Sequence, residues 1–510
     1  MKKLFKYLFI GMFGMLFLSS CSNDMLETEP TDKMSGSTFM SDAAKALVPL
    51  NGIYRSMFEP GWSTTGNTHQ CFGISAYNLM AEVMGEDFIM SSSGSGWFWY
   101  DCTYDVKDLY ARTTWRSYDL WTAYYSWVSN ANYILAAEET MGGSEADVAY
   151  VMGQAYAIRA YSYFMLAQTF ARTYKGHESD PCVPIYTEPT FTSTTGQPRS
   201  NVQAVYTQID NDINKAVEYL SKSRGQQHRS HISYAVALGL KARISLVEEN
   251  WADALDAAQK AIAASGREIL PVKDFMGNNN VSAGNVMWGA EIIKDQSSMY
   301  ASLMAHMDTV AYGQSAHKQI SIWLYNKMNS SDTRRAWWDP TNETYSDGGY
   351  IQRKFQFSDI QTWLGDYVWM RVEEMYLTAA EAACRLGQEG VAKDYLMALM
   401  SVRDPNYTCN KSGTSLGALT TDITGSLLEE ILIQRRIELW GEDGRVYTIR
   451  RLKQGFERTT DMGWPDNALL PNVNVANPES YAWVLTIPQT EFDGNENFDA
   501  VKDQNPIGDE

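Results

Sequence analysis

Cysteine, histidine and clustered basic residues are all scarce in this chain. Its six cysteines are widely spaced and form no CxxC pair, which argues against a zinc ribbon or a thioredoxin-type redox centre. The 42 basic residues are outnumbered by 61 acidic ones, and the formal net charge is −19. Binding to a nucleic-acid backbone needs a basic patch, and no run of Lys and Arg supplies one. We therefore exclude nucleic acid as a partner.

Long hydrophobic runs are missing as well, except at the N-terminus. There, three lysines flank the start of an apolar stretch, Tyr7 to Leu18, that is too short to span a bilayer comfortably. The residues that follow, up to Cys21, look like a bacterial lipobox; the alternative is an ordinary secretory signal with a chance cysteine. Cleavage before Cys21 would leave its thiol to carry diacylglycerol, and each buried methylene of a lipid anchor contributes ~0.8 kcal/mol. We expect a lipid-anchored protein and not an integral one.

What the chain does contain is helical periodicity that recurs in pairs. His231 to Ala264 predicts two helices joined by a short turn, each with one apolar stripe. Small residues such as Ala242 and Ala254 would let these helices approach closely. Two further pairs are predicted at 153–170 with 206–220 and within 371–400. The pattern resembles tetratricopeptide repeats, and the alternative is a helical core with alanine-rich packing.

Composition divides the chain into five parts. Residues 1–20 form the signal peptide, 21–41 a polar tether, and 42–268 a helical scaffold with an aromatic loop near 91–104. Residues 269–366 are rich in Asn, Ser, Gly, Trp and Tyr and predict a loop-rich subdomain, the kind of segment that often carries function. Residues 367–510 form a C-terminal helical scaffold and a closing segment. Beyond the pairs, helices are predicted at 43–58, 71–85, 113–137 and 427–452.

Several short motifs occur in a fixed order along the second half of the chain. They are SDTRR at 331–335, RVEEMYLTAAEA at 371–382, RRIELWGEDGR at 435–445, IPQTE at 487–491, then Asn495 and DQNP at 503–506. Together with the lipobox cysteine, they resemble the SusD/RagB family of outer-membrane lipoproteins from Bacteroidetes. Three positions depart from the family pattern: Asp443 stands where Gly is expected, Thr448 where Asp is common, and Glu496 where Pro is usual.

The resemblance implies both a fold and a function. The fold would be mainly α-helical, a tetratricopeptide-like scaffold of helix pairs with an irregular, loop-rich part that binds the ligand. The family works without catalysis as the surface lid of a SusC-like TonB-dependent transporter, and its members capture glycans or, in some cases, peptides. The protein would then lie on the cell surface, anchored to the outer membrane by lipid.

Glycan capture requires a particular set of side chains. Sugar rings present apolar C–H faces that pack on Trp and Tyr, and aromatic side chains supply this area at a low cost in rotamer entropy. The polar, flexible run 91–96 ends in four consecutive aromatic residues. We predict a ligand platform there and a second contribution from the irregular region; the alternative is that these rings pin their loops to the core. The predicted ligand residues are Trp97, Trp99, Tyr100, Tyr300, Tyr312 and Trp323.

No arrangement of residues indicates catalysis or a metal. Neighbouring carboxylates, as in Glu82, Glu86 and Asp87, are expected by chance among 61 acids, although glycosidases do use such pairs. Glu373 and Glu374 are expected to pair with arginines on the family's helix. The sequence has no phosphate-binding loop and no dinucleotide fingerprint, so we predict no cofactor.

Two weak metal patterns remain. His228 and His231 have the i, i+3 spacing of metal ligands, but no third ligand is evident. Residues 493–497 place oxygen donors at alternate positions, faintly like a calcium loop, but lack its Gly and its final Glu. A structural calcium ion is therefore an alternative that the sequence leaves open.

Two functions from different classes are consistent with the sequence. The first is a glycan-binding lipoprotein that delivers oligosaccharides to a TonB-dependent transporter. The second is a surface lipoprotein that binds peptides or uses its helix pairs as a scaffold for another protein. Neutral aromatic loops favour sugar, whereas charged side chains around the platform would favour peptide.

Overall fold

The computed structural model describes residues 40–60, 67–105, 113, 115–341 and 348–509. Cys21, the predicted lipidation site, lies outside these residues, as does most of the predicted tether. Within the described part of the chain, no helix is both long enough and apolar enough to cross a bilayer.

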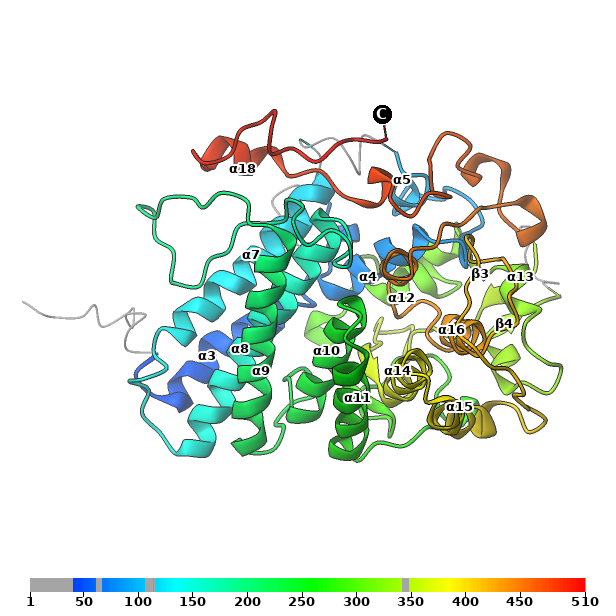
Figure 1. The fold of residues 1–510 in the computed structure, drawn as a ribbon, viewed down its shortest axis with the longest axis horizontal. Helices are drawn as coiled ribbons and strands as arrows, with labels where there is room; N and C mark the ends of the chain where they lie inside the picture. The colour runs from blue at the N-terminus through cyan, green and yellow to red at the C-terminus, as the bar shows by residue number, and fades with distance from the viewer. Residues whose placement is uncertain (1–39, 61–66, 106–112, 114, 342–347, 510) are drawn as a thin grey trace, which may run out of the picture.

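Helices packed side by side are the main regular structure of the molecule, which confirms the predicted mainly helical fold. Successive neighbours pack against each other from α7 through α11, and α11 then packs against α14 and α14 against both α15 and α16. Figure 1 shows this array running from α7, α8 and α9 at the left to α14 and α15 at the right. The bounds are α7 Trp115–Leu135, α8 Glu145–Phe170, α9 Val202–Lys222, α10 Tyr234–Val247, α11 Trp251–Ser265, α14 Val372–Arg385, α15 Glu389–Arg403 and α16 Leu427–Glu438.

The hairpin of α10 and α11 forms as its alanines predict. Ala242 and Ala254 are fully buried where the two helices pack together, and the Asn250 side chain caps α11 by accepting a hydrogen bond from the Asp253 backbone N–H. Gly239 of α10 meets the next layer, since a Cβ there would lie 2.5 Å from the sulfur of Met370. Small residues therefore set the spacing of this part of the array.

Two predicted helices are shorter than expected. The helix predicted at 71–85 is α4 (Ile74–Val83), preceded by a 3-10 turn, η2 (Thr68–Gln70). The helical stretch predicted at 427–452 is two helices, because α16 ends at Glu438 and α17 covers only Arg445–Arg451. Between them Gly441 and Gly444 take positive φ values of 81° and 64°. That backbone conformation is natural for glycine and ends a helix. The helices predicted at 43–58 and 113–137 are α3 (Ala43–Ser56) and α7.

Residues 269–366 are built of short helices, 3-10 turns and strands. They include β2 (Val286–Ala290), α12 (Leu303–Met307), η5 (Ala311–Gln314), β3 (Lys318–Ile320), α13 (Ile322–Tyr325), β4 (Trp338–Asp339) and β5 (Ile351–Gln352). A four-stranded antiparallel sheet has the order β1-β3-β5-β4, where β1 (Phe88–Met90) comes from far upstream and Phe88 lies opposite Ile320. A second pair joins β2 to β6 (Tyr367–Arg371). The strands thus tie this region to the segments on either side of it.

Buried ion pairs join the motif segments inside the core. The Arg371 guanidinium lies 2.7 Å from Glu442 and 3.0 Å from Glu438, and Arg403 lies 2.9 Å from Glu438 and 3.2 Å from Glu373. These arginines hold the pKa of Glu438 well below its usual range, against the opposing effect of burial.

Arginine partners also confirm the expectation for the two neighbouring glutamates of α14, since Glu374 pairs with Arg243 at 2.6 Å. Removing one member of such a buried pair leaves an uncompensated charge. The motifs therefore serve the scaffold.

Candidate functional site

Four rings from distant parts of the chain meet at one place, which we call the aromatic cluster: His69, Trp97, Tyr300 and Tyr312. His69 lies in η2, Trp97 just before the short helix α5 (Trp99–Cys102), Tyr300 just before α12, and Tyr312 in η5. The His69 ring centroid lies 5.3 Å from that of Trp97, 5.7 Å from Tyr300 and 5.6 Å from Tyr312. Tyr312 is also 5.0 Å from Tyr300 and 5.8 Å from Trp97. These spacings are those of stacked and edge-to-face aromatic pairs.

Hydrogen bonds to His69 hold the aromatic cluster in place. The Tyr312 hydroxyl and His69 Nδ1 are joined by a 2.5 Å hydrogen bond, and His306 Nε2 donates to the His69 carbonyl at 2.7 Å. Burial lowers the pKa of His306 to about 3, so this ring is neutral under ordinary conditions and carries its proton on Nε2. It also stacks on Tyr312, with centroids 5.2 Å apart. The neutral, buried ring of His306 thus supports the cluster.

The loop that carries Trp97 is held in the same way. Phe98 takes a positive φ of 62°, an uncommon conformation for a bulky residue, and its backbone N–H donates to the side chain of Gln70 at 2.7 Å. Arg116 pairs with Asp101 of α5 at 2.6 Å and also donates to Gln70. Gln70 is the neighbour of His69, so one polar network positions both Trp97 and His69.

The aromatic cluster is open on one side. The Tyr300 side chain is 42% exposed, while His69, Trp97 and Tyr312 are half-buried. The indole Nε1 of Trp97 is shielded from solvent and has no hydrogen-bond partner among the described residues. Such a group is costly to leave unpaired, so a ligand that reaches this donor would gain a hydrogen bond.

Three of the predicted ligand residues lie elsewhere. Trp99 is half-buried against the core, and Tyr100, also in α5, is 41% exposed. Trp323 in α13 lies against two cations, with Lys327 Nζ at 4.2 Å and the Arg436 guanidinium at 4.7 Å from its ring centroid. The structure therefore brings together Trp97, Tyr300 and Tyr312, and places Trp323 over a buried ion pair of Arg436 and Asp87.

His69 was not predicted from the sequence. It lies in a polar loop with no periodic pattern, and only the fold brings it to the tyrosines. A cavity of about 300 Å³ is lined by Arg55 of α3, by residues 58–60 and by residues 295–298. The last of these residues, Ser298, is two positions before Tyr300. The polar lining of the cavity includes Arg55, Glu59 and Asp295, so hydrogen-bonding groups lie close in sequence to an exposed ring.

The carboxylates that the sequence places together have structural roles. Glu86 lies 2.7 Å from the Arg445 guanidinium and Asp87 lies 2.7 Å from that of Arg436. Glu82 accepts from the backbone N–H groups of Asp443 and Arg445, at 3.0 Å and 3.2 Å. All three are buried with their partners in the core, so they do not flank an open cleft.

The residues of the two weak metal patterns also make hydrogen bonds to other side chains. His231 hydrogen-bonds Tyr150 at 2.7 Å through Nδ1 and Asn51 at 2.9 Å through Nε2, so both ring nitrogens are engaged. In the loop 493–497, Asp493 accepts from Gln489, and Asn495 donates to Glu491. Across the residues that the structure describes, no group of three His, Cys, Asp or Glu side chains is placed to hold a metal ion.

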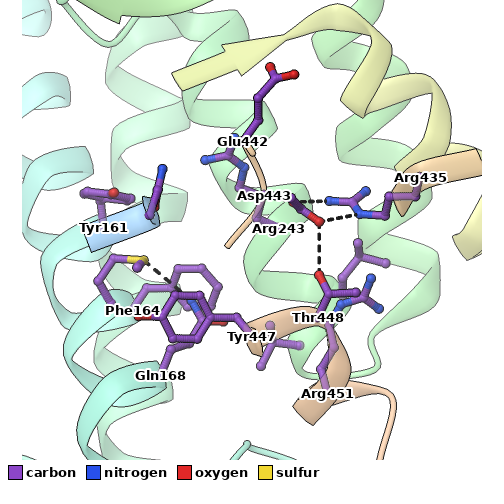
Figure 2. A pocket seen from close by; sticks show the side chains of 14 residues that line it. Tyr161, Phe164, Gln168, Arg243, Arg435, Glu442, Asp443, Tyr447, Thr448 and Arg451 are labelled. Atoms are coloured by element: carbon purple, nitrogen blue, oxygen red, sulfur yellow. Dashed lines mark hydrogen bonds and ion pairs between the residues drawn. The ribbon is translucent and has the colours of Figure 1, made fainter. Parts of the chain in front are cut away.

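A second, internal cavity lies between the helical array and α17 (Figure 2). It has a volume of about 60 Å³, far below the several hundred Å³ of typical ligand sites. Charged groups line it, among them Arg243, Arg435 and Asp443. The Asp443 carboxylate accepts from Arg435 at 2.7 Å and 2.9 Å. Its size and paired charges suit a few water molecules, so we assign this cavity to the scaffold.

Comparisons with known proteins agree with the fold. A family model described as "Starch-binding associating with outer membrane" matches residues 73–246, and the model of the SusD family matches residues 294–507. No curated protein matches the chain.

Several solved structures are similar over their whole length. A SusD-like carbohydrate binding protein from Bacteroides vulgatus is 24% identical with a TM-score of 0.73, and the match covers 90% of this chain and 97% of that one. A SusD superfamily protein from Bacteroides thetaiotaomicron is 20% identical with a TM-score of 0.71, covering 91% and 100%. Surface glycan-binding protein A from Bacteroides thetaiotaomicron, solved with laminarihexaose, is 16% identical with a TM-score of 0.66, covering 90% and 98%. At these identities the likeness establishes the fold.

Proposed function

Because this chain belongs to the SusD family, as its motifs predict, we propose that it captures oligosaccharides on the aromatic cluster and delivers them to a SusC-like TonB-dependent transporter. The proteins of this family bind glycans without catalysis. The observation that carries the proposal is the aromatic cluster itself: four rings fixed against one another, one of them exposed, beside an unpaired indole donor.

The chemistry of the cluster suits a neutral sugar. The apolar C–H face of a pyranose can pack on the exposed Tyr300 ring, and a sugar hydroxyl that reaches the shielded Trp97 Nε1 would pair this donor. Rigid aromatic anchors of this kind typically contribute about 1–3 kcal/mol each to binding. The cluster is already held by the His69 and His306 hydrogen bonds, so little ordering is needed when the ligand binds.

The aromatic faces of the cluster favour sugar over peptide. Its four rings contact one another and His306, which burial keeps uncharged. The cation next to the cluster, Arg116, lies over the ring of Phe98 and is paired with Asp101. Lys327 and Arg436 lie over Trp323, outside the cluster. Two relatives described above, one named as carbohydrate binding and one bound to laminarihexaose, support the same ligand class.

The anchor and the location follow from the N-terminus and the family. We propose that Cys21 is acylated and holds the protein on the outer membrane, where it would face the polysaccharides outside the cell. The description of the matching family model, which associates starch binding with the outer membrane, supports this location. Residues 21–41 would then act as the tether between the lipid and the helical scaffold.

Affinity electrophoresis tests the proposal directly. The detergent-purified protein would run through gels that contain plant, fungal or host polysaccharides, beside Tyr300→Ala and Tyr100→Ala variants. We expect one or more polysaccharides to retard the wild-type protein and Tyr100→Ala, and to retard Tyr300→Ala much less. Relief in Tyr100→Ala alone would move the platform to α5, and no retardation by any polysaccharide would contradict the proposed ligand class.

A further inference from the structure

A second aromatic groove lies between α7, the loop 184–196 and α18 (Gln489–Gly494). We call it the α7–α18 groove. Its volume is about 560 Å³, within the range of small-molecule sites. Five aromatic side chains line it: Tyr118, Trp121, Tyr125, Tyr186 and Phe191.

The rings of the groove are fixed by contacts across its walls. Trp121 Nε1 donates to Glu491 of α18 at 3.1 Å, and the Tyr125 hydroxyl donates to the carbonyl of Pro184 at 2.7 Å. Tyr125 lies 4.9 Å from Trp121 and 6.0 Å from Tyr186, centroid to centroid. The three walls are therefore tied together before any ligand arrives.

The groove is separate from the aromatic cluster. The two share no lining residue, and Figure 1 places α18 at the upper left, away from α5 and α12 near the cluster. Its walls come from both matched regions of the chain: α7 and the loop 184–196 lie within residues 73–246, and α18 lies within residues 294–507. Nothing in the function proposed above uses this groove.

The polarity of the lining defines what the groove can bind. Of the described residues that line it, Glu491 alone carries a charge, and both of its oxygens already accept hydrogen bonds, from Trp121 and from Asn495. The remaining polar groups are mainly hydroxyls, including Thr122, Ser126, Ser129, Thr190, Thr194 and Thr490. An anionic ligand would find no cation there. Ser129 and Thr190 already hydrogen-bond each other, and Thr194 accepts from the Phe191 N–H, but a purely apolar ligand would offer no partner to any of these polar groups.

A ligand with apolar faces and a neutral, hydroxyl-rich edge fits both sets of groups. We infer that the α7–α18 groove is a second binding site for a neutral oligosaccharide, in addition to the aromatic cluster. The inference rests on the proposed function in one respect, namely that the ligand of this protein is a carbohydrate. Two sites on one rigid body would hold two segments of a polysaccharide at once, which raises the effective concentration of the second segment.

Isothermal titration calorimetry with short oligosaccharides separates the two sites. The probes are maltohexaose, laminarihexaose, cellohexaose and mannohexaose, with hexagalacturonate as an anionic counterpart. The cluster variant is Trp97→Ala with Tyr300→Ala, and the groove variant is Tyr118→Ala with Phe191→Ala. Phe191 is 65% exposed and Tyr118 half-buried. A further variant, Ser126→Trp, fills the groove from an exposed position without removing a ring.

We expect the wild-type protein to bind two molecules of at least one neutral hexaose. The cluster variant, the groove variant and Ser126→Trp should each bind one, and the anionic hexamer should not bind in the groove. Unchanged binding in both groove variants would overturn the inference and leave the proposed function standing. Loss of all binding in the groove variants, with normal binding in the cluster variant, would support the groove and contradict the aromatic cluster. If none of the neutral probes binds, both assignments fall.

Discussion

Thr448 donates a hydrogen bond to Asp443, with its Oγ1 3.1 Å from the carboxylate Oδ2 (Figure 2). These are two of the positions at which the chain departs from the pattern of its family, with Asp in place of the expected Gly and Thr in place of the common Asp. The Asp443 carboxylate also accepts from Arg435. One carboxylate thus lies beside this arginine, and the hydroxyl at the second departing position hydrogen-bonds to it.

A pair of substitutions tests whether position 448 can supply this carboxylate. Asp443→Gly should lower the free energy of unfolding by about 3 kcal/mol, because the buried Arg435 loses its closest anion. Adding Thr448→Asp should recover much of the lost stability, since position 448 then supplies a carboxylate for Arg435. Urea unfolding of the wild type, both single variants and the double variant measures the coupling. A double variant no more stable than Asp443→Gly would show that the two positions do not exchange roles.

A conservative change at Trp97 separates binding from folding. Trp97→Phe keeps an aromatic ring but removes the unpaired Nε1 donor. We expect the variant to unfold at the same or higher urea concentration than the wild type, because an unsatisfied buried donor is lost. Its affinity for an oligosaccharide should fall about three- to tenfold, the value of one hydrogen bond.

The neighbouring tryptophan provides the matched control for this change. Trp99→Phe removes an indole donor outside the aromatic cluster and should leave affinity unchanged. If the two variants bind equally well, the Trp97 donor does not contact the ligand.

A carboxyl pair between α9 and α10 makes part of the stability depend on pH. Burial and the nearby Asp210 raise the pKa of Glu248 to about 8. Since the pKa in the folded state lies above that in the unfolded chain, the folded state binds the extra proton, and the contribution of Glu248 to stability is lost as pH rises toward 8. Glu248→Gln should therefore become more stable, relative to the wild type, between about pH 5 and 8. Thermal unfolding across this range measures the difference.

The adjacent residue controls for the loss of one negative charge. Glu249→Gln changes the next carboxyl and should give a difference from the wild type that does not vary with pH in this way. A flat difference for Glu248→Gln as well would mean that Glu248 and Asp210 do not share a proton in the folded protein.

The lipid anchor is testable without any ligand. Cys21→Ala should abolish incorporation of labelled palmitate and release the protein from the membrane fraction, because the acylated thiol is its proposed anchor. Ser20→Ala is a matched control next to the cleavage site and should remain labelled. Labelling that persists in Cys21→Ala would contradict the lipobox assignment.

The helical scaffold could be predicted from sequence because its signal is local. The alanines and the apolar stripes of 231–264 predict two helices, and the structure has them as α10 and α11. The break between α16 and α17 was missed because its causes are only partly local. The glycines are visible in the sequence, but the Glu82 carboxylate that accepts from the backbone there comes from hundreds of residues upstream.

The candidate site was predictable only in part, for the same reason. Trp97, Tyr300 and Tyr312 stood out as aromatic residues in polar segments, and the structure brings their rings together. Trp323 met the same criterion, yet its ring lies on Arg436 of a distant helix. Composition cannot tell these cases apart, because the partner that decides each one is remote in sequence. His69 gave no signal at all, since one histidine in a polar loop has no pattern to detect.

The hydrogen bond between His69 and Tyr312 joins residues 243 positions apart, and this has a consequence for biogenesis. A chain that crosses the inner membrane from its N-terminus delivers His69 and Trp97 long before Tyr300 and Tyr312. The helix hairpins can form as they emerge, but the aromatic cluster closes only after about three-fifths of the chain has been exported. Such long-range contacts form late in folding. On the proposed function, a newly exported chain would therefore hold no sugar in the cluster before Tyr312 has emerged, and truncation before residue 300 would leave helices with no cluster.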